Sequence, residues 1–278
     1  MTNKDLSEVS AIVQCTLRRI GTRLKAEIET PSNYKINFKG KNDLVTELDL
    51  WAQLEIVKDL NEHFPDHSVL AEESSNDELL RSFSSGTWWV VDPIDGTSNF
   101  ANQIPYFGIS AGLIIDGKRT IGLVYDPIKD EMFSAIRGYG SMLNGKKISL
   151  AQKTELCHAV VATGFPYDRV NAWDTWRDTY EFFFTRCRAI RRFGAATLDQ
   201  CWVACGRFDA FFEFGLKPWD VAAGSLIVEE AGGISANFST PATGEFSIKG
   251  DSYLFTNKTL AEYMFKAPAG TIPTGSKH

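Results

Sequence analysis

The sequence lacks the features that identify membrane, secreted and repeat proteins. No apolar run approaches the ~18 residues that a membrane-spanning helix needs, and the first residues lack the charged-then-apolar layout of a signal peptide. No internal repeat is visible, and no two cysteines have the C-x-x-C spacing of a zinc or redox site. We therefore expect a soluble cytoplasmic protein that does not bind a membrane.

Cysteine and excess positive charge are also scarce. The five cysteines form an odd set, which fits reduced thiols in a reducing compartment. The formal net charge is −6, whereas nonspecific binding to nucleic acid needs a basic surface. We therefore predict no nucleic-acid partner, and an anionic substrate would need bound cations to offset the negative charge of the chain.

The hydrophobic pattern predicts a mixed α+β protein in two halves. Hydrophobic residues make up 44% of the 278 residues, which is enough for one large domain or two modest ones. Apolar residues spaced by threes and fours predict an amphipathic helix over residues 6–28. Strand-like segments separated by turns predict an antiparallel meander over residues 107–136. From residue 158 strands and helices alternate, which is typical of an α/β unit.

Subdomain boundaries and loops are predicted from the same pattern. We predict an N-terminal α+β subdomain over residues 1–150 and a C-terminal α/β subdomain over residues 151–268. Residues 269–278 are rich in Gly, Pro and Thr and are predicted to form a disordered tail. A basic segment within residues 31–42 is predicted to be a loop, which is either solvated or able to close over an anion.

The most informative segment lies where a strand ends in paired carboxylates. The apolar run over residues 88–91 has strand character and is followed by the sequence Asp92-Pro93-Ile94-Asp95-Gly96-Thr97. Proline and glycine on either side of Asp95 can fold the chain so that both carboxylates and the Ile94 carbonyl converge. Converging hard oxygen donors suit Mg²⁺ or Mn²⁺. The segment therefore predicts a metal site.

Phosphate is the expected companion of such a metal. If a helix begins just after Asp95, the free amides of Gly96 and Thr97 point at the same place, and free amides at a helix N-terminus bind phosphate. Metal and phosphate would then share one pocket. Taken alone, Pro-x-Asp-Gly after a strand is also ordinary turn chemistry, so the assignment depends on companions elsewhere in the chain.

Further carboxylates occupy comparable positions in the sequence. A short predicted strand ends in Glu72 and Glu73, and position alone does not choose between them. Asp220 precedes a helix predicted over residues 221–231, where its carboxylate caps the helix, faces a metal, or does both. Asp49 stands close to the start of another predicted helix and is either a surface charge or a capping group.

Three of these segments, in this order, resemble the inositol monophosphatase family of Mg²⁺-dependent, lithium-sensitive phosphatases. They are Ala71-Glu72-Glu73, Asp92-Pro93-Ile94-Asp95-Gly96-Thr97, and Trp219-Asp220-Val221-Ala222-Ala223-Gly224 with Glu229-Glu230-Ala231-Gly232-Gly233. The resemblance extends over about residues 6–267 and includes Asp43-Leu44-Val45-Thr46 and Gly194-Ala195-Ala196. It implies the layered αβαβα sugar-phosphatase fold, which is commonly assembled as a homodimer.

The resemblance assigns metal ligands by matching motif. It implies that Glu72, Asp92 and the Ile94 carbonyl hold a first Mg²⁺, and it thereby resolves the choice between the two adjacent glutamates. It implies that Asp92, Asp95 and Asp220 hold a second Mg²⁺, so that Asp92 bridges the two ions. A third, weaker ion is expected near Glu72. Two or three Mg²⁺ ions per site are therefore expected, and Mn²⁺ suits the same ligands.

The implied activity is hydrolysis of a phosphate monoester by an activated water. Such an ester is an anion that repels hydroxide, so a metal has to lower the pKa of a water and neutralise charge on the phosphoryl oxygens. By resemblance, Glu72 and Thr97 orient the water, and Asp49 holds the Thr97 hydroxyl. The amides of Gly96 and Thr97 would hold the phosphate.

The implied substrate is myo-inositol 1-phosphate. By resemblance Gly194, Ala195 and Ala196 line the sugar site beside Asp220, although Ala195 lacks the hydroxyl that the family often places there. Glu213 lies where the family places an acceptor for ring hydroxyls, which favours inositol 1-phosphate over histidinol phosphate; otherwise Glu213 is a surface residue at a strand end. The alternatives are a fructose-1,6-bisphosphatase or broad polyol phosphatase, and a non-catalytic regulatory protein that keeps the fold.

Overall fold

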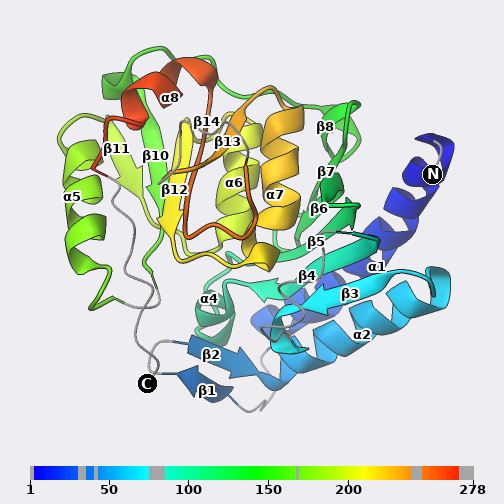
Figure 1. Cartoon of the computed structure of the whole chain (residues 1–278). Coiled ribbons are helices and arrows are strands. Elements are labelled where there is room, and N and C mark those ends of the chain that lie inside the picture. Colours follow the sequence, from blue (N-terminus) through cyan, green and yellow to red (C-terminus); the bar gives the residue numbers. More distant parts are fainter. Residues whose placement is uncertain are drawn as a thin grey trace.

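The fold is a stack of alternating layers of helices and sheets. The structure is a computed structural model that describes residues 3–30, 36–40, 43–74, 85–166, 169–238 and 246–268 (Figure 1). From one side to the other the layers are a helix pair, a seven-stranded sheet, a second helix pair, a five-stranded sheet and a third helix pair. The predicted αβαβα arrangement is therefore confirmed.

Two long helices form the first layer because each has one apolar face. They are α1 (Asn3–Glu29) and α2 (Glu47–His63), and their buried side chains include Leu17 and Ile56. These pack with Trp89 of the larger sheet in one apolar cluster. Burial of such side chains removes apolar area from water, at roughly 25 cal/mol per Å². The layer covers the first face of the sheet.

The seven-stranded sheet contains the predicted meander. Its strands lie in the order of the chain and are β3 (Ser68–Ala71), β4 (Thr87–Asp95), β5 (Gly108–Ile115), β6 (Lys118–Asp126), β7 (Glu131–Ile136), β8 (Gly140–Leu143) and β9 (Lys146–Lys147). β3 is parallel to β4, and all the other neighbours are antiparallel. β8 was not predicted, because its four residues lie between two turn sequences that dominate the local pattern.

The five-stranded sheet is mixed. Its spatial order is β11-β10-β12-β14-β13, with β10 (Val160–Thr163), β11 (Ala189–Arg191), β12 (Ala210–Phe214), β13 (Ile234–Asn237) and β14 (Ser252–Thr256). β10 is parallel to β11 and β12, whereas β14 is antiparallel to β12 and β13. The predicted alternation of strands and helices is confirmed for β10 to β12, which are connected through α5 (Trp173–Phe184) and α6 (Ala196–Ala204).

The central helices are buried from both sides. α6 and α7 (Pro218–Glu230) lie between the two sheets, and α5 and α8 (Lys258–Met264) cover the outer face of the five-stranded sheet (Figure 1). In α7 every residue from 218 to 228 is buried, as expected of a helix covered on all sides. The core around α6 and α7 draws on both halves of the chain, so the predicted subdomain boundary near residue 150 stays a prediction.

Some shorter segments complete the description. They are the 3-10 turns η1 (Glu72–Ser74) and η2 (Leu156–His158), and the short helix α4 (Thr97–Ala101). The loop prediction for residues 31–42 was wrong in part, because β1 (Ile36–Gly40) pairs antiparallel with β2 (Asp43–Thr46). The predicted tail over residues 269–278 lies outside the described residues. None of the described helices is both long and apolar enough to cross a membrane.

Candidate metal centre

Three buried aspartates bring their carboxylates together at one place in the fold. Asp92 and Asp95 come from the end of β4, and Asp220 comes from the first turn of α7. One carboxylate oxygen of each lies within 4.8 Å of the other two, and the three residues are only 1–7% exposed. The side chains that we predicted as metal ligands from two distant motifs therefore share one pocket.

An irregularity at the end of β4 lets both of its aspartates face this pocket. Asp92 is opposite Ser110 on β5 and Asp95 is opposite Gly108, so β4 has one more residue than β5 over this interval. Side chains three residues apart on a regular strand point to opposite faces, and a bulge changes that alternation. The intervening proline has no N–H for the ladder. The Ile94 amide instead donates to Asp92 Oδ1 at 3.1 Å.

The carboxylate of Asp95 caps a helix from the other half of the chain. The amides of Ala196 and Thr197 at the start of α6 donate to its two oxygens at 3.1 and 2.6 Å, and the Thr197 hydroxyl donates as well. The residue before α6 is Ala195, which has no side-chain acceptor for these free amides. Asp95 therefore satisfies them, and the positive end of the helix dipole favours its negative charge.

Asp220 is held by the start of its own helix. α7 begins at Pro218, and proline is favoured at the first helical position. Asp220 is consequently the third helical residue and not the N-cap that we considered from the sequence. Its carboxylate accepts a hydrogen bond from the amide of Lys217 at 2.6 Å. This contact fixes the side chain while it faces the cluster.

Burial and mutual repulsion raise the pKa of the clustered carboxyl groups. Burial raises the pKa of Asp92 well above its ordinary value, and the negative charges of Glu72 and Asp95 raise it further. Burial and then Asp95 act in the same way on the pKa of Asp220. The pKa of Asp95 is also raised by burial, although the hydrogen bonds from Thr197 oppose that rise.

A divalent cation fits this donor set. Within the part of the chain that the structure describes, no lysine or arginine forms an ion pair with the three aspartates. Buried carboxylates that repel one another are stabilised by a cation among them. Mg²⁺ and Mn²⁺ prefer oxygen ligands of this kind.

Glu72 lies in the pocket, whereas its neighbour Glu73 does not line it. β3 is parallel to β4, so the residue after β3 lies beside the carboxylates at the end of β4. The backbone amide of Glu73 donates to Gln53 Oε1 on α2 at 2.8 Å. The position of Glu72 agrees with the choice between the two glutamates that the resemblance implies.

Asp49 is fully buried beside Thr97. The Thr97 hydroxyl lies 3.1 Å from both Asp49 Oδ1 and the Ile94 carbonyl oxygen, and it can donate to either. The amide of Thr46 donates to Asp49 Oδ2 at 2.8 Å, so Asp49 also completes the N-terminal capping box of α2. Burial raises the pKa of Asp49 to about 6. Of the two readings of Asp49 from sequence, the capping group is the one observed.

The helix start that we predicted after Asp95 is present but short. α4 begins at Thr97, and the residue before it, Gly96, has a φ of 93°, a backbone region that favours glycine. A Cβ at Gly96 would lie 3.0 Å from the carbonyl oxygen of Gly194 and 3.2 Å from Ala195 Cβ. Gly96 and Thr97 both line the pocket. The turn into α4 therefore needs glycine at position 96, both because of the positive φ and because a side chain would contact the Gly194 segment too closely.

The wall predicted to contact the substrate alcohol is formed by β12 and the segment before α6. Gly194, Ala196 and Glu213 line the pocket, whereas Ala195 is fully buried and does not. The Glu213 carboxylate lies so close to Gly164 that a Cβ there would be 2.0 Å from the carboxylate carbon. Burial, followed by neighbouring negative charges, raises the pKa of Glu213 well above its ordinary value. Glu213 is thus a partly buried residue that lines the pocket, and not a residue of the open surface.

Two kinds of site residue were not predicted from the sequence. One is the pair of threonines that hydrogen-bond to the carboxylates of Asp49 and Asp95, and the other is a part of the pocket wall. The missed residues are Thr46, Thr197, Phe165, Arg169 and Arg192. A threonine three residues before an acidic residue is a capping-box signal, so Thr46 could have been found. Nothing in the local pattern marks the other four, because their partners are distant in sequence.

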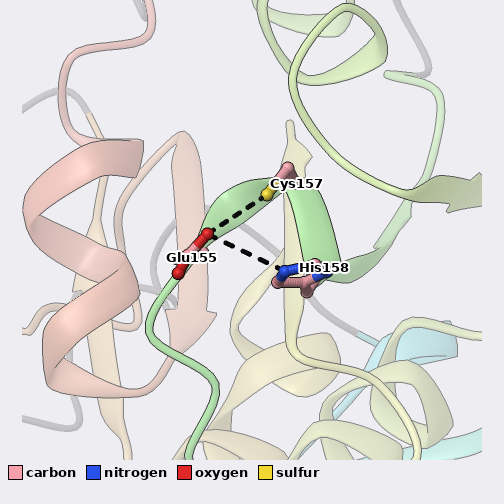
Figure 2. Close-up of side chains that lie close together, drawn as sticks. All are labelled: Glu155, Cys157 and His158. Carbon is pink, nitrogen blue, oxygen red and sulfur yellow. Dashed lines mark hydrogen bonds and ion pairs between the residues drawn. The ribbon is translucent and has the colours of Figure 1, made fainter.

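A second group of metal-type side chains belongs to a single exposed turn. Figure 2 shows Glu155, Cys157 and His158, which approach one another at η2. Cys157 Sγ donates to Glu155 Oε2 at 3.5 Å, and His158 Nε2 lies 3.8 Å from the same oxygen. All three residues are exposed. The group lacks both burial and the convergence of separate elements, so we assign no metal to it.

The chain is similar to known proteins over most of its length. Nus factor SuhB of Escherichia coli strain K12 is 38% identical over 244 residues, which are 88% of this chain and 87% of that protein. The structure of Thermotoga maritima IMPase has a TM-score of 0.82 at 31% identity, over 94% of this chain and 96% of its own. Inositol monophosphatase-II of Staphylococcus aureus MSSA476 has a TM-score of 0.78 at 30% identity, over 93% and 94%. A sequence model of the inositol monophosphatase family matches residues 5–268, and the chain therefore belongs to that family.

Proposed function

We propose that the protein is a Mg²⁺-dependent phosphomonoesterase that hydrolyses myo-inositol 1-phosphate. The observation that carries the proposal is the buried cluster of Asp92, Asp95 and Asp220, whose pKa values are raised and which has no ion-pair partner among the described residues. Such a cluster attracts divalent cations, and a divalent cation is what an anionic ester needs to approach an acidic chain. Membership of the inositol monophosphatase family supports the same activity.

The ligands are proposed from the residues that line the pocket. Glu72, Asp92 and the Ile94 carbonyl would hold one Mg²⁺, and Asp92, Asp95 and Asp220 would hold a second. A third, weaker ion is proposed near Glu72. Bound Mg²⁺ supplies the chemistry that the chain lacks, which is to lower the pKa of a water and to neutralise charge on the phosphoryl oxygens. Mn²⁺ would suit the same oxygen donors.

The chain's own groups position the water and the phosphate in this proposal. Asp49 would accept the hydroxyl hydrogen of Thr97, which would leave the Thr97 oxygen free to accept from a water. Glu72 would accept a hydrogen bond from the same water and orient it for attack. The amides of Gly96 and Thr97 would donate to phosphate oxygens where β4 turns into α4.

Inositol is the proposed alcohol because of Glu213. A carboxylate beside a polyol discriminates among substrates through the hydroxyl groups that it accepts from. Gly194 and Ala196 leave space beside it. SaIMPase-II has been crystallised with inositol monophosphate bound and also with 2′-AMP bound. Lithium sensitivity and a homodimeric assembly, both common in the family, are part of the proposal.

A second candidate is a regulatory protein that keeps the fold without turnover. One observation favours it, since a relative 38% identical to this chain is named Nus factor SuhB. The presence of every carboxylate that the metal site needs favours the enzyme. The two candidates differ in a simple respect, because only the enzyme has to release phosphate.

Phosphate release by the purified, metal-stripped protein tests the proposal. The substrates are myo-inositol 1-phosphate, fructose 1,6-bisphosphate, histidinol phosphate and 3′-phosphoadenosine 5′-phosphate, each with and without Mg²⁺. We expect Mg²⁺-dependent release that is fastest from inositol 1-phosphate. Faster release from another ester would change the assigned substrate and leave the proposed mechanism intact. No release from any of them would favour the regulatory candidate.

A further inference from the structure

Gly164 provides the space in which the Glu213 carboxylate lies. A Cβ at Gly164 would be 2.0 Å from the carboxylate carbon of Glu213, and 2.0 and 2.1 Å from its two oxygens. Such distances are far shorter than any real contact of a Cβ, so the carboxylate fills the place of the missing side chain. The proposed acceptor for ring hydroxyls therefore lies where it does because residue 164 is glycine.

The five-stranded sheet brings these two residues side by side. Thr163 at the end of β10 is opposite Phe212 on β12, and the two strands are parallel. Gly164 and Glu213 are the next residues along, and neighbouring strands of a sheet are about 4.8 Å apart. Gly164 is not among the described glycines with positive φ, so its backbone conformation does not itself require glycine. The requirement is one of space beside the carboxylate.

A tryptophan of the outer helix layer holds Gly164 in this position. Trp176 Nε1 on α5 donates to the Gly164 carbonyl oxygen at 3.0 Å, and the Thr163 hydroxyl donates to the same oxygen at 3.3 Å. The Trp176 ring is fixed in turn by Phe165, edge-to-face at 5.1 Å between centroids, and by Tyr180, stacked at 4.9 Å. α5 covers the outer face of the sheet (Figure 1). The described residues that line the pocket of the three aspartates do not include Trp176.

We propose that Gly164 and Trp176 are positioning residues that set the preference for a polyol by fixing the Glu213 carboxylate. This role rests on the proposed function and deepens it, because it assigns substrate specificity to a contact with the outer helix layer. A hydrogen bond weakens steeply as its distance and angle depart from the optimum, so a displaced carboxylate accepts poorly from ring hydroxyls. Neither residue belongs to the turn between β4 and α4, to which the reacting phosphate is assigned.

Gly164→Ala moves the carboxylate without removing it. The added methyl group would meet the end of a flexible side chain and not backbone, so Glu213 can shift and the fold is kept. We expect kcat/KM for myo-inositol 1-phosphate to fall by about tenfold or more, mainly through KM, because ring hydroxyls are bound before and during the reaction. For phenyl phosphate, which has no ring hydroxyls, kcat/KM should change by less than about threefold. Circular dichroism checks that the variant is folded.

Trp176→Phe tests the second positioning residue by a milder change. It removes the indole N–H and keeps an aromatic ring in the stack. The Gly164 carbonyl retains its bond from Thr163, so the ratio of kcat/KM for inositol 1-phosphate to that for phenyl phosphate should fall less, by about threefold or more. Should Gly164→Ala fail to fold, this variant decides alone.

Trp173→Phe is the matched control for the loss of an indole N–H. Trp173 lies on the same helix, is 53% exposed, and stacks on Trp176 with 6.1 Å between ring centroids. Among the described residues, the donors to the Gly164 carbonyl oxygen are Trp176 and Thr163. Trp173→Phe should therefore keep the ratio of the wild type. An equal fall in Trp173→Phe and Trp176→Phe would overturn the assignment to Trp176.

The Glu213→Ala background shows whether both residues act through the carboxylate. With no carboxylate to displace, Gly164→Ala and Trp176→Phe should each change the ratio by less than about twofold. A purely structural role would lower activity by the same factor with and without Glu213. The same fall in both backgrounds would thus overturn the positioning role.

The outcomes separate this role from the proposed function. If the wild type hydrolyses inositol 1-phosphate, an unchanged ratio in either variant overturns the role of that residue and leaves the proposed function intact. If no ester releases phosphate, the proposed function fails, and the Kd of inositol 1-phosphate from calorimetry replaces kcat/KM. Weaker binding by Gly164→Ala would then support the positioning of Glu213, and an equal Kd would overturn it.

Discussion

The Asp95 carboxylate accepts a hydrogen bond from the amide of Thr197 at 2.6 Å, although the two residues are 102 positions apart in sequence. Asp95 ends a strand of the seven-stranded sheet, and Thr197 belongs to the first turn of α6 beside the five-stranded sheet. The contact thus joins the two halves of the chain at the aspartate cluster. The geometry of the site consequently depends on the packing of both sheets around α6.

Removal of one negative charge from the cluster tests its role as a metal site. Asp95→Asn and Asp220→Asn should each lower turnover by about 10²-fold or more, because each variant loses a charged ligand while it keeps the side-chain volume. Circular dichroism should show a folded protein in both cases. Near-normal turnover in either variant would contradict the assignment of these residues as metal ligands.

The contribution of Thr197 can be separated from that of Asp95. Thr197→Val removes the hydroxyl that donates to the Asp95 carboxylate and keeps the shape of the side chain. Loss of a buried hydrogen bond to a charged group should lower the free energy of unfolding by about 1.5–3 kcal/mol, measured by urea denaturation. Thr197→Ser keeps the hydroxyl and is the control. No loss of stability in Thr197→Val, or a loss no larger than that in Thr197→Ser, would show that the hydroxyl hydrogen bond does not stabilise the fold.

Asp49 should make the metal-free protein less stable as pH rises. Burial raises its pKa to about 6 in the folded state, from 3.8 in the absence of the fold, so the folded state binds more protons between these values. The contribution of Asp49 to the free energy of unfolding should therefore fall by about 3 kcal/mol as pH rises through this interval, and the raised pKa values of Asp92, Asp95 and Asp220 act in the same direction. His67 has a lowered pKa and acts in the opposite direction.

The comparison of wild type with Asp49→Asn isolates the contribution of Asp49 to the pH dependence of stability, because both proteins retain His67. Urea denaturation in EDTA at pH 4.5, 5.5 and 6.5 gives the two profiles. The free energy of unfolding of the wild type should fall relative to that of the variant as pH rises. A constant difference across these values would show that Asp49 has no raised pKa.

Glu213 should determine the preference for a polyol. Glu213→Gln keeps the volume of the side chain and removes the negative charge that would accept from ring hydroxyls, so kcat/KM for inositol 1-phosphate should fall by about tenfold or more. Phenyl phosphate has no ring hydroxyls and is the control substrate, whose kcat/KM should change little. A similar fall for both esters would assign Glu213 to the reacting phosphate and not to the alcohol.

Much of the site could be predicted because its ligands occur in short contiguous motifs. Asp92, Asp95 and Asp220 were all named from sequence, and the structure brings them together. The amphipathic periodicity of α1 and the alternation of elements after residue 158 were also sufficient to predict a mixed α+β protein, whereas the layered arrangement was implied by the family resemblance. These features are local, so they can be recognised in the sequence without knowledge of contacts between distant residues.

What could not be predicted depends on contacts between distant residues. The bulge in β4 exists only relative to β5, and the cap that Asp95 provides exists only once α6 packs beside it. Arg192 follows β11, the edge strand beside β10, and lines the pocket only because this sheet packs beside the end of β4. β1 was misread because its alternating apolar and polar residues lie in a basic segment that resembles a solvated loop.

Calorimetric titration of the metal-stripped protein with Mg²⁺ tests the central claim most directly. The account predicts saturable binding in the wild type at pH 7.5, weaker binding at pH 5.5 because protons compete for the carboxylates, and a loss of at least one binding event in Asp220→Asn. Equal Mg²⁺ binding by wild type and Asp220→Asn, or no binding by either, would contradict it.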